Sequence, residues 1–570
     1  MDHGFAVSGY LRAYVAASLS AVLLAAACSG AVSGSNRDPG DKDDGGAAGE
    51  ASNGGAGGEE MGDPPALDQP IQKPTCKISG DKSGMRRLTN FELRNTVADL
   101  LGLTSQTLGS LETGDNVRDG YDNNVAVQSV LEAEGKSFNA FAERAANSVT
   151  SDFAKATGCQ ATDATCASQW LLSTAKRAYR RPLADDEKAR LQTLFDQLRT
   201  EFDLSTAFAS TLTYMLQTPH FLYRREGITG TDAWEVASRL SYLLWGTMPD
   251  ADLFAAAESG ELKKATTLEQ QVKRMIGDDR AKRGIKHFFW QWLYLDELEK
   301  RDKAESVVSS YQSTVRPDLV AEAGAYIDHV ASDEGTPVSD LFDGAYTFRN
   351  KALASIYGGS AGSTELQKVQ TDPQRSAGIL TTGAVLAATS LADISSPILR
   401  GKLVRERVLC THLPVPMVVP ELQRITGATE REIFEQHSKN PTCAGCHALI
   451  DPIGFAFENF DAIGRWRDKY SNGANVDANG EIVEAGDAEG KVSGVAELGK
   501  KLAQSDFVNR CLSSQFYQYA VGRDLTSNDA CALDWMAYNL SKKGSGNFRA
   551  ALTAITTTPA IAGPSIEGAK

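Results

Sequence analysis

Apolar residues recur every three or four positions along most of the chain, the spacing that places them on one face of an α-helix. The clearest example is residues 90–101, in which Leu93 and Val97 share a face. Thr89 and Glu92 stand three residues apart at its start, which is the arrangement of a capping box. The pattern therefore predicts a helix with a defined first turn.

The same periodicity predicts a mainly α fold. The further helices that it indicates cover residues 130–148, 167–179, 185–198, 205–216, 232–245, 250–257, 268–276, 281–295, 317–330, 495–503, 508–521 and 531–540. Strand signals are thin. At residues 475–483, Val476 precedes a turn-like sequence that is followed by Ile482 and Val483, which predicts one small β-hairpin.

Residues 287–293 contain a dense run of aromatic side chains that could line a binding groove. Aromatic residues at helical spacing usually pack inward, so we favour a helix core. His287, His220 and His329 are expected to be hydrogen-bonded histidines rather than metal ligands.

The first 75 residues differ from the rest. Arg12 precedes an apolar run over residues 13–27 that ends in small residues, as a signal peptide does, and is too short to span a bilayer comfortably. Cys28 follows directly, as in a bacterial lipoprotein signal, so Cys28 is either lipidated or lost with the cleaved peptide. Residues 29–75 are rich in Gly, Ala, Ser and Asp, which predicts a disordered tether.

The remaining residues are enough for several domains. We expect N-terminal helical domains over residues 76–228, a central helical domain over 229–365, a motif-bearing segment over 366–470 and a C-terminal helical domain over 471–570. The formal net charge of -15 argues against a nucleic-acid partner. Because no second apolar segment is long enough to span a bilayer, membrane contact is expected only through a lipid anchor.

The most informative motif is Cys-Ala-Gly-Cys-His, which contains Cys443, Cys446 and His447. Two thiols at this spacing can each form a thioether with a vinyl group of haem, and the histidine that follows can bind the iron from the same face. The motif predicts covalent haem c, which makes residues 366–470 a cytochrome-c-like segment. The alternative is a structural or redox Cys-x-x-Cys pair with an incidental histidine.

The second axial ligand has several candidates. Thr429 and Glu432 form a capping box for a helix that ends near His437, six residues before Cys443, so His437 ranks first. Met417 ranks second and Met536 third. An iron with an open position would indicate small-molecule or peroxide chemistry instead of electron transfer.

Residues after the motif suggest how a haem would be held. A carbonyl group, with Pro452 as the candidate, is expected to orient the second ring nitrogen of His447. The aromatic residues downstream could wall the haem, form ordinary core, or do both, and these are Phe455, Phe457, Phe460 and Trp466.

Nine cysteines occur in the chain, and six remain after Cys28 and the motif are set aside: Cys76, Cys159, Cys166, Cys410, Cys511 and Cys531. An even number suits three disulfides in an oxidising compartment. Short spacing favours Cys159–Cys166 and Cys511–Cys531, and elimination leaves Cys76–Cys410. The alternative is that some are free, buried thiols.

Five segments resemble large exported bacterial proteins built of consecutive domains of unknown function, which end near a cytochrome-c-like motif and are common beside planctomycete-type cytochromes. The segments are residues 87–102, 178–183, 239–250, 396–402 and 437–467. The resemblance implies a mostly helical, multi-part exported protein and no established activity. Similar sequences often carry methionine where this chain has Ile450, so a ligand at that position is not expected here.

These observations predict a c-type haem protein that is exported to the periplasm or outer membrane. It would act in electron transfer or oxidation at the cell envelope with a redox partner that the sequence does not identify. One alternative is a non-haem structural or binding protein in which Cys443 and Cys446 form a disulfide. Another is a peroxidase-like haem enzyme.

Overall fold

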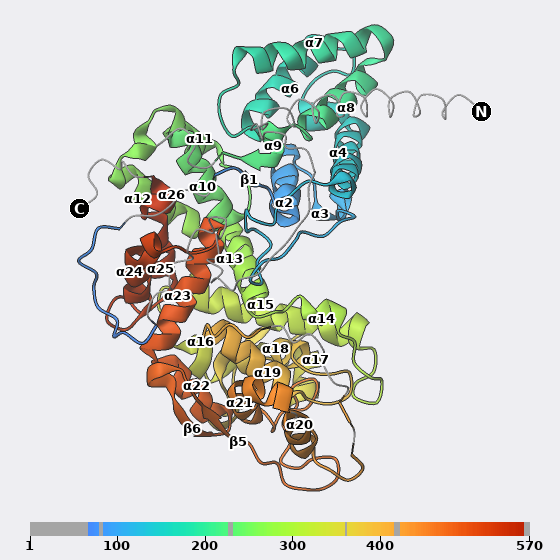
Figure 1. Cartoon of the computed structure of the whole chain (residues 1–570). Coiled ribbons are helices and arrows are strands. Elements are labelled where there is room, and N and C mark those ends of the chain that lie inside the picture. Colours follow the sequence, from blue (N-terminus) through green and yellow to red (C-terminus); the bar gives the residue numbers. More distant parts are fainter. Residues whose placement is uncertain are drawn as a thin grey trace, which may run out of the picture. The chain divides into compact units, whose positions relative to one another are not determined.

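Helices make up most of the chain that the structure describes, so the predicted mainly α fold is confirmed (Figure 1). The computed structural model describes residues 67–78, 84–225, 232–358, 362–414, 422–423, 425–439 and 441–563. The predicted signal segment with Cys28, most of the predicted tether and Met417 lie outside the described residues. Within those ranges no helix is long and apolar enough to cross a membrane.

The first group of helices builds its own hydrophobic core, mainly from residues between Leu88 and Leu222. These helices are α2 (Asn90–Leu101), α3 (Ser105–Leu108), α4 (Glu132–Ser151), α5 (Phe153–Thr157), α6 (Ala164–Ala178), α7 (Asp185–Glu201), α8 (Leu204–Met215) and α9 (Pro219–Leu222). The predicted capping box of α2 is present, because Thr89 and Glu92 each accept the backbone N–H of the other. Antiparallel strands β1 (Arg86–Arg87) and β2 (Tyr223–Arg224) pair across this region.

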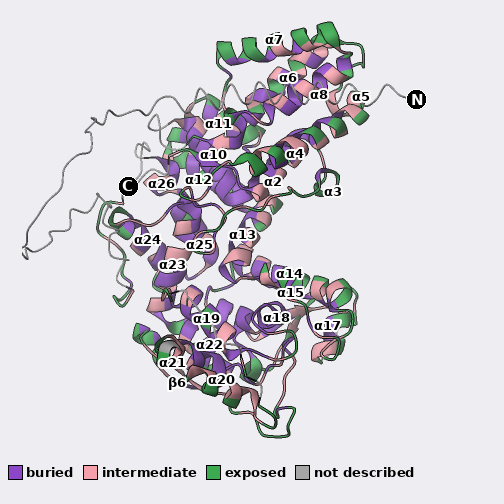
Figure 2. Cartoon of the chain, turned by 45° about the vertical axis from the view of Figure 1, so that its right-hand side comes forward, coloured by how far each residue is buried: buried purple, intermediate pink, exposed green. Residues whose placement is uncertain are grey.

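A second, larger core is shared by the central and C-terminal helices. The central helices are α10 (Ala233–Trp245), α11 (Ala251–Glu258), α12 (Ala265–Ile276), α13 (Asp279–Trp292), α14 (Glu297–Lys300), α15 (Arg316–Ser332), α16 (Asp340–Asp343), α17 (Lys351–Tyr357) and α18 (Gly383–Ala388). The later helices are α19 (Pro397–Leu403), α20 (Glu430–Ser438), α21 (Pro441–Phe455), α22 (Val495–Gln504), α23 (Asp506–Val521), α24 (Ala530–Leu540), α25 (Phe548–Thr556) and α26 (Pro559–Ala562). Every residue of α18 is buried, whereas the outer face of α7 is exposed (Figure 2).

Short helical turns connect these elements. Turns of 3₁₀ type cover Glu261–Lys263, Pro373–Arg375, Gly378–Thr381, Gly486–Ala488 and Ser527–Asp529, and π-helical turns cover Tyr311–Val315 and Val404–Val408.

The described residues contain three antiparallel strand pairs instead of the single predicted hairpin. Beyond β1 and β2, the pairs are β3 (Tyr346–Arg349) with β4 (Gln367–Gln370) and β5 (Asn479–Ile482) with β6 (Gly490–Ser493). The hairpin predicted at residues 475–483 is displaced, because residues 479 and 480 begin β5 rather than form a turn. The reason is tertiary packing. A Cβ at Gly480 would lie 2.2 Å from the carbonyl oxygen of Pro452, so this glycine allows β5 to approach α21 closely.

The aromatic run of α13 packs into the core, as predicted. Phe288, Phe289 and Trp292 are fully buried. His287 lies elsewhere on the helix, and its Nε2 is 2.9 Å from the Asp122 carboxylate. Its role as a hydrogen-bonded histidine is therefore confirmed.

All six cysteines predicted to pair form disulfides, but two of the three predicted partnerships are wrong. The local bridge Cys159–Cys166 is present. The structure joins Cys76 to Cys531 and Cys410 to Cys511, in place of Cys76–Cys410 and Cys511–Cys531.

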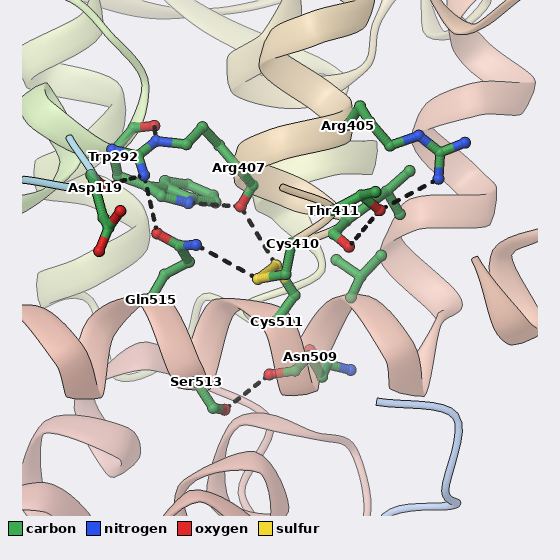
Figure 3. The surroundings of a disulfide bond; sticks show 12 residues. Asp119, Trp292, Arg405, Arg407, Cys410, Thr411, Asn509, Cys511, Ser513 and Gln515 are labelled. Carbon is green, nitrogen blue, oxygen red and sulfur yellow. Dashed lines mark hydrogen bonds between the residues drawn. A yellow bond between two sulfur atoms is a disulfide. The ribbon is translucent and has the colours of Figure 1, made fainter. Parts of the chain in front are cut away.

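The two cysteine side chains on α23 and α24 point to different parts of the chain, and this explains the exchange of partners. Cys511 is buried on α23 and meets Cys410, beside the Gln515 side chain, whose Nε2 is 3.5 Å from Cys410 Sγ (Figure 3). Cys531 on α24 instead meets the extended segment 67–78, which Arg510 holds through a 2.7 Å hydrogen bond to the carbonyl of Gln69. Helices adjacent in sequence need not turn their cysteines toward each other.

Removing the Cys410–Cys511 bridge, by Cys410→Ala and Cys511→Ala together, should lower stability strongly. The bridge closes a loop with a sequence separation of 101, for which loop entropy corresponds to about 4–5 kcal/mol. The matched control is Cys159→Ala with Cys166→Ala, whose separation of 7 corresponds to about 2–3 kcal/mol by the same relation. Thermal unfolding of the oxidised proteins should show the larger fall in melting temperature for the first pair. Equal falls would contradict the entropic account.

Candidate functional site

One helix carries the whole Cys-Ala-Gly-Cys-His motif. Helix α21 begins at Pro441, a favoured residue for a first helical position, and runs through the motif. Cys443 and Cys446 are three residues apart, and His447 is four residues after Cys443, so the three side chains share one face of the helix. The helix continues past Pro452, where a helix would ordinarily end because proline lacks an N–H group.

The two thiols of the motif differ from the other described cysteines in their bonding state. Cys443 and Cys446 are half-buried, and among the described residues they are the two cysteines outside disulfides. A Cβ at Gly445 would meet no atom within 4 Å. Gly445 is two residues after Cys443, so the open space lies on the side of α21 away from the face that the motif side chains share.

A carboxylate, not a carbonyl, orients the imidazole of His447. Its Nδ1 lies 2.9 Å from Oδ1 of Asp451 and 3.2 Å from the hydroxyl of Ser438. The exposed fractions of the His447 and Asp451 side chains are 12% and 6%. Because the Nδ1 hydrogen points to Asp451, the ring keeps Nε2 available for a metal.

The predicted role of the Pro452 carbonyl is therefore wrong. That carbonyl faces Gly480 of β5. On a continuous helix, the residue four positions after His447 lies under its ring, and that residue is Asp451. The i, i+4 spacing of His447 and Asp451 was visible in the sequence, but it has this meaning only if the helix continues.

His437 lies close to His447, as the sequence predicts. It occupies the last turn of α20, and the two ring centroids are 5.4 Å apart with the rings at 72°. Burial and the neighbouring His447 lower the pKa of His437, and Asp451 offsets part of this effect. The two rings are in edge-to-face contact, so nothing lies between them.

Helix α21 is seated on α19 by direct backbone contact. A Cβ at Gly454 would lie 1.9 Å from the carbonyl oxygen of Pro397, and one at Gly401 would lie 2.1 Å from that of Ile450. Ile450 thus packs against α19. Only glycine at both positions allows the two helices to approach this closely.

Arg400 of α19 binds the chain just after α21. Its guanidinium is buried and donates to the carbonyls of Phe457, Phe460 and Asp461 at 3.0, 2.8 and 2.7 Å. Burial lowers the pKa of Arg400 to about 10, which leaves it charged at neutral pH. The end of α21 is therefore fixed by a charged donor.

A buried carboxylate cluster, which the sequence did not reveal, joins α20 to the same region. Arg467 donates to Glu430, the first residue of α20, at 2.8 Å. Tyr470 donates to the fully buried Glu458 at 2.9 Å, and burial raises the pKa of Glu458. These contacts set the position of α20 and hence of His437.

The aromatic residues downstream of the motif serve as core. Phe457 and Phe460 belong to the large core, and Trp466 packs on Phe460 with ring centroids 5.3 Å apart. Phe455 is buried under the guanidinium of Arg431, which is 4.1 Å from the centre of its ring.

Met536, the third candidate for the second ligand, is fully buried in the larger core. Among the described residues, no three His, Cys, Asp or Glu side chains are grouped so that they could hold a metal by themselves.

Five consecutive segments match family models that are each described as a protein of unknown function: DUF1587 at residues 86–151, DUF1595 at 166–226, DUF1592 at 231–358, DUF1588 (PSCyt3) at 376–470 and DUF1585 at 489–561. The chain carries five consecutive domains of unknown function. This series is consistent with the expected planctomycete-type family, and α19, α20 and α21 all lie in the DUF1588 match. No curated protein and no solved structure matches the chain.

Gly454→Ala should destabilise the site, because the added methyl group overlaps the Pro397 carbonyl. Overpacking of this kind costs about 1–3 kcal/mol. Gly445→Ala on the same helix is the matched control and should be neutral or stabilising by about 0.5–1 kcal/mol, because its surroundings are open and alanine favours helix. Thermal unfolding of the two variants, both prepared without haem, checks this. If Gly454→Ala is as stable as the unaltered protein, the close contact of α19 and α21 is not a constraint.

Proposed function

We propose that this protein is an exported c-type haem protein that acts in electron transfer or oxidation at the cell envelope. Cys443 and Cys446 would form the two thioethers, and Nε2 of His447 would bind the iron. The observation that carries the proposal is the common helix face of these three residues, with both thiols outside disulfides. A haem bound there supplies one-electron redox chemistry.

The donor set fits a covalent haem. Both thiols are half-buried and outside disulfides, so they are available for thioether bonds. The second nitrogen of His447 is already engaged by Asp451, so the ring is oriented and Nε2 is the nitrogen left for the metal.

Cysteine usage supports export. Six cysteines of the described chain form three disulfides, and disulfides persist mainly in oxidising compartments such as the periplasm. The proposed location is the periplasm or outer membrane, with Cys28 as the lipidation site. The partner would be a redox protein or carrier, and the acidic net charge disfavours nucleic acid.

His437 is the proposed second histidine ligand of the haem. It comes from α20, whose start is held by the Arg467–Glu430 pair. Its ring contacts that of His447, so both histidines could hold the haem only if the last turn of α20 moved away from α21.

The same contact favours a second candidate, a peroxidase-like haem protein. If α20 stays where it is, His437 would not bind the haem, and the haem could take a small ligand instead. Carbon monoxide binding to the reduced protein would favour this candidate over electron transfer.

Replacing both motif cysteines, Cys443→Ser with Cys446→Ser, should abolish covalent haem. The protein is produced with the cytochrome c maturation machinery, and intact mass and acid–acetone extraction report the attachment. The matched control is Cys159→Ser with Cys166→Ser, which also removes two thiols but should keep the haem. Colourless unaltered protein with a Cys443–Cys446 disulfide would overturn the proposal and favour a non-haem structural or binding role.

His437→Ala should shift the ferric visible spectrum toward a high-spin form, because a strong nitrogen ligand is lost. His412→Ala serves as the control, since His412 is exposed and also precedes the motif. An unchanged spectrum in His437→Ala would remove His437 as the ligand.

A further inference from the structure

Asp451 forms hydrogen bonds that would influence the reduction potential of an iron bound at His447. Both carboxylate oxygens are engaged: Oδ1 accepts from Nδ1 of His447 at 2.9 Å, and Oδ2 accepts from the Ser438 hydroxyl. The Ser438 hydroxyl must donate to Asp451, because two oxygens in that contact would otherwise repel each other. The imidazole, the carboxylate and the hydroxyl thus form one aligned group.

Among the described residues, no lysine or arginine forms an ion pair with this carboxylate, and its ionic partner is His447. Its side chain is 6% exposed, so water screens the interaction little. The negative charge therefore acts mainly on the imidazole.

A carboxylate that accepts the Nδ1 hydrogen makes the imidazole a more basic metal ligand than a backbone carbonyl does. A more basic ligand stabilises the ferric state relative to the ferrous state. We infer that Asp451 is a positioning residue that sets a low reduction potential for the iron held by His447, and that Ser438 limits this effect. This inference rests on the proposed haem.

Asp451 and Ser438 act in opposite directions. The Ser438 hydroxyl competes for the charge of the carboxylate, so removing it leaves more of that charge on His447. Replacing Asp451 by a neutral amide removes the charge itself. A purely structural role, in which both residues only support α21, would not produce shifts of opposite sign.

The test is the midpoint potential of the haem-loaded full chain, measured by spectroelectrochemical titration. Asp451→Asn should raise the midpoint potential by about 59 mV, which corresponds to a tenfold change in the ferric–ferrous equilibrium constant for a one-electron couple. Ser438→Ala should lower it. Asp477→Asn is the matched control and should leave it unchanged, because Asp477 carries the same charge but pairs with Arg431 at 3.3 Å.

The outcomes separate this inference from the haem proposal. Haem-loaded Asp451→Asn with an unchanged or lower potential overturns the inference and leaves the haem in place. If Asp451→Asn takes up no haem, Ser438→Ala decides, because a raised or unchanged potential there also overturns it. Unaltered protein without covalent haem overturns the proposed function itself.

Discussion

The site depends on backbone contact between α19 and α21. At Gly401 and Gly454 the carbonyl of the facing helix occupies the room that a side chain would need. Interiors packed at this distance do not tilt or slide without losing many contacts together. Arg400, on the same short helix as Gly401, then fixes the carbonyls that follow α21. One seven-residue helix thus sets both the direction of α21 and its end.

Local signals were enough to predict many of the helices. Helices α2 and α20 begin at capping boxes, and both form where the sequence places them. Helix α21 could not be predicted in the same way, because Pro452 argues locally for an end. The contacts that carry the helix past this residue come from α19 and β5, and so from parts of the chain that periodicity does not connect.

The candidate site likewise has residues that the local sequence predicts and residues that only tertiary packing brings together. Cys443, Cys446, His447 and His437 lie within a few residues of one another, so the sequence could bring them together. Asp451 and Ser438 were missed, because their meeting at Nδ1 of His447 requires both helices in their final positions. Disulfide partners were the hardest to predict, since Cys76 and Cys531 are separated by 455 positions.

The Cys76–Cys531 bond also decides where the body would bear mechanical load. The segment before it runs along α23 and α24, with Ile71 buried and its N–H 3.1 Å from the Asp506 carboxylate. A force applied to the chain ahead of residue 67 would pass through a covalent link into α24. The helices from α2 to α23 follow the segment in sequence, but they would carry none of this force because the disulfide bond transmits it directly to α24.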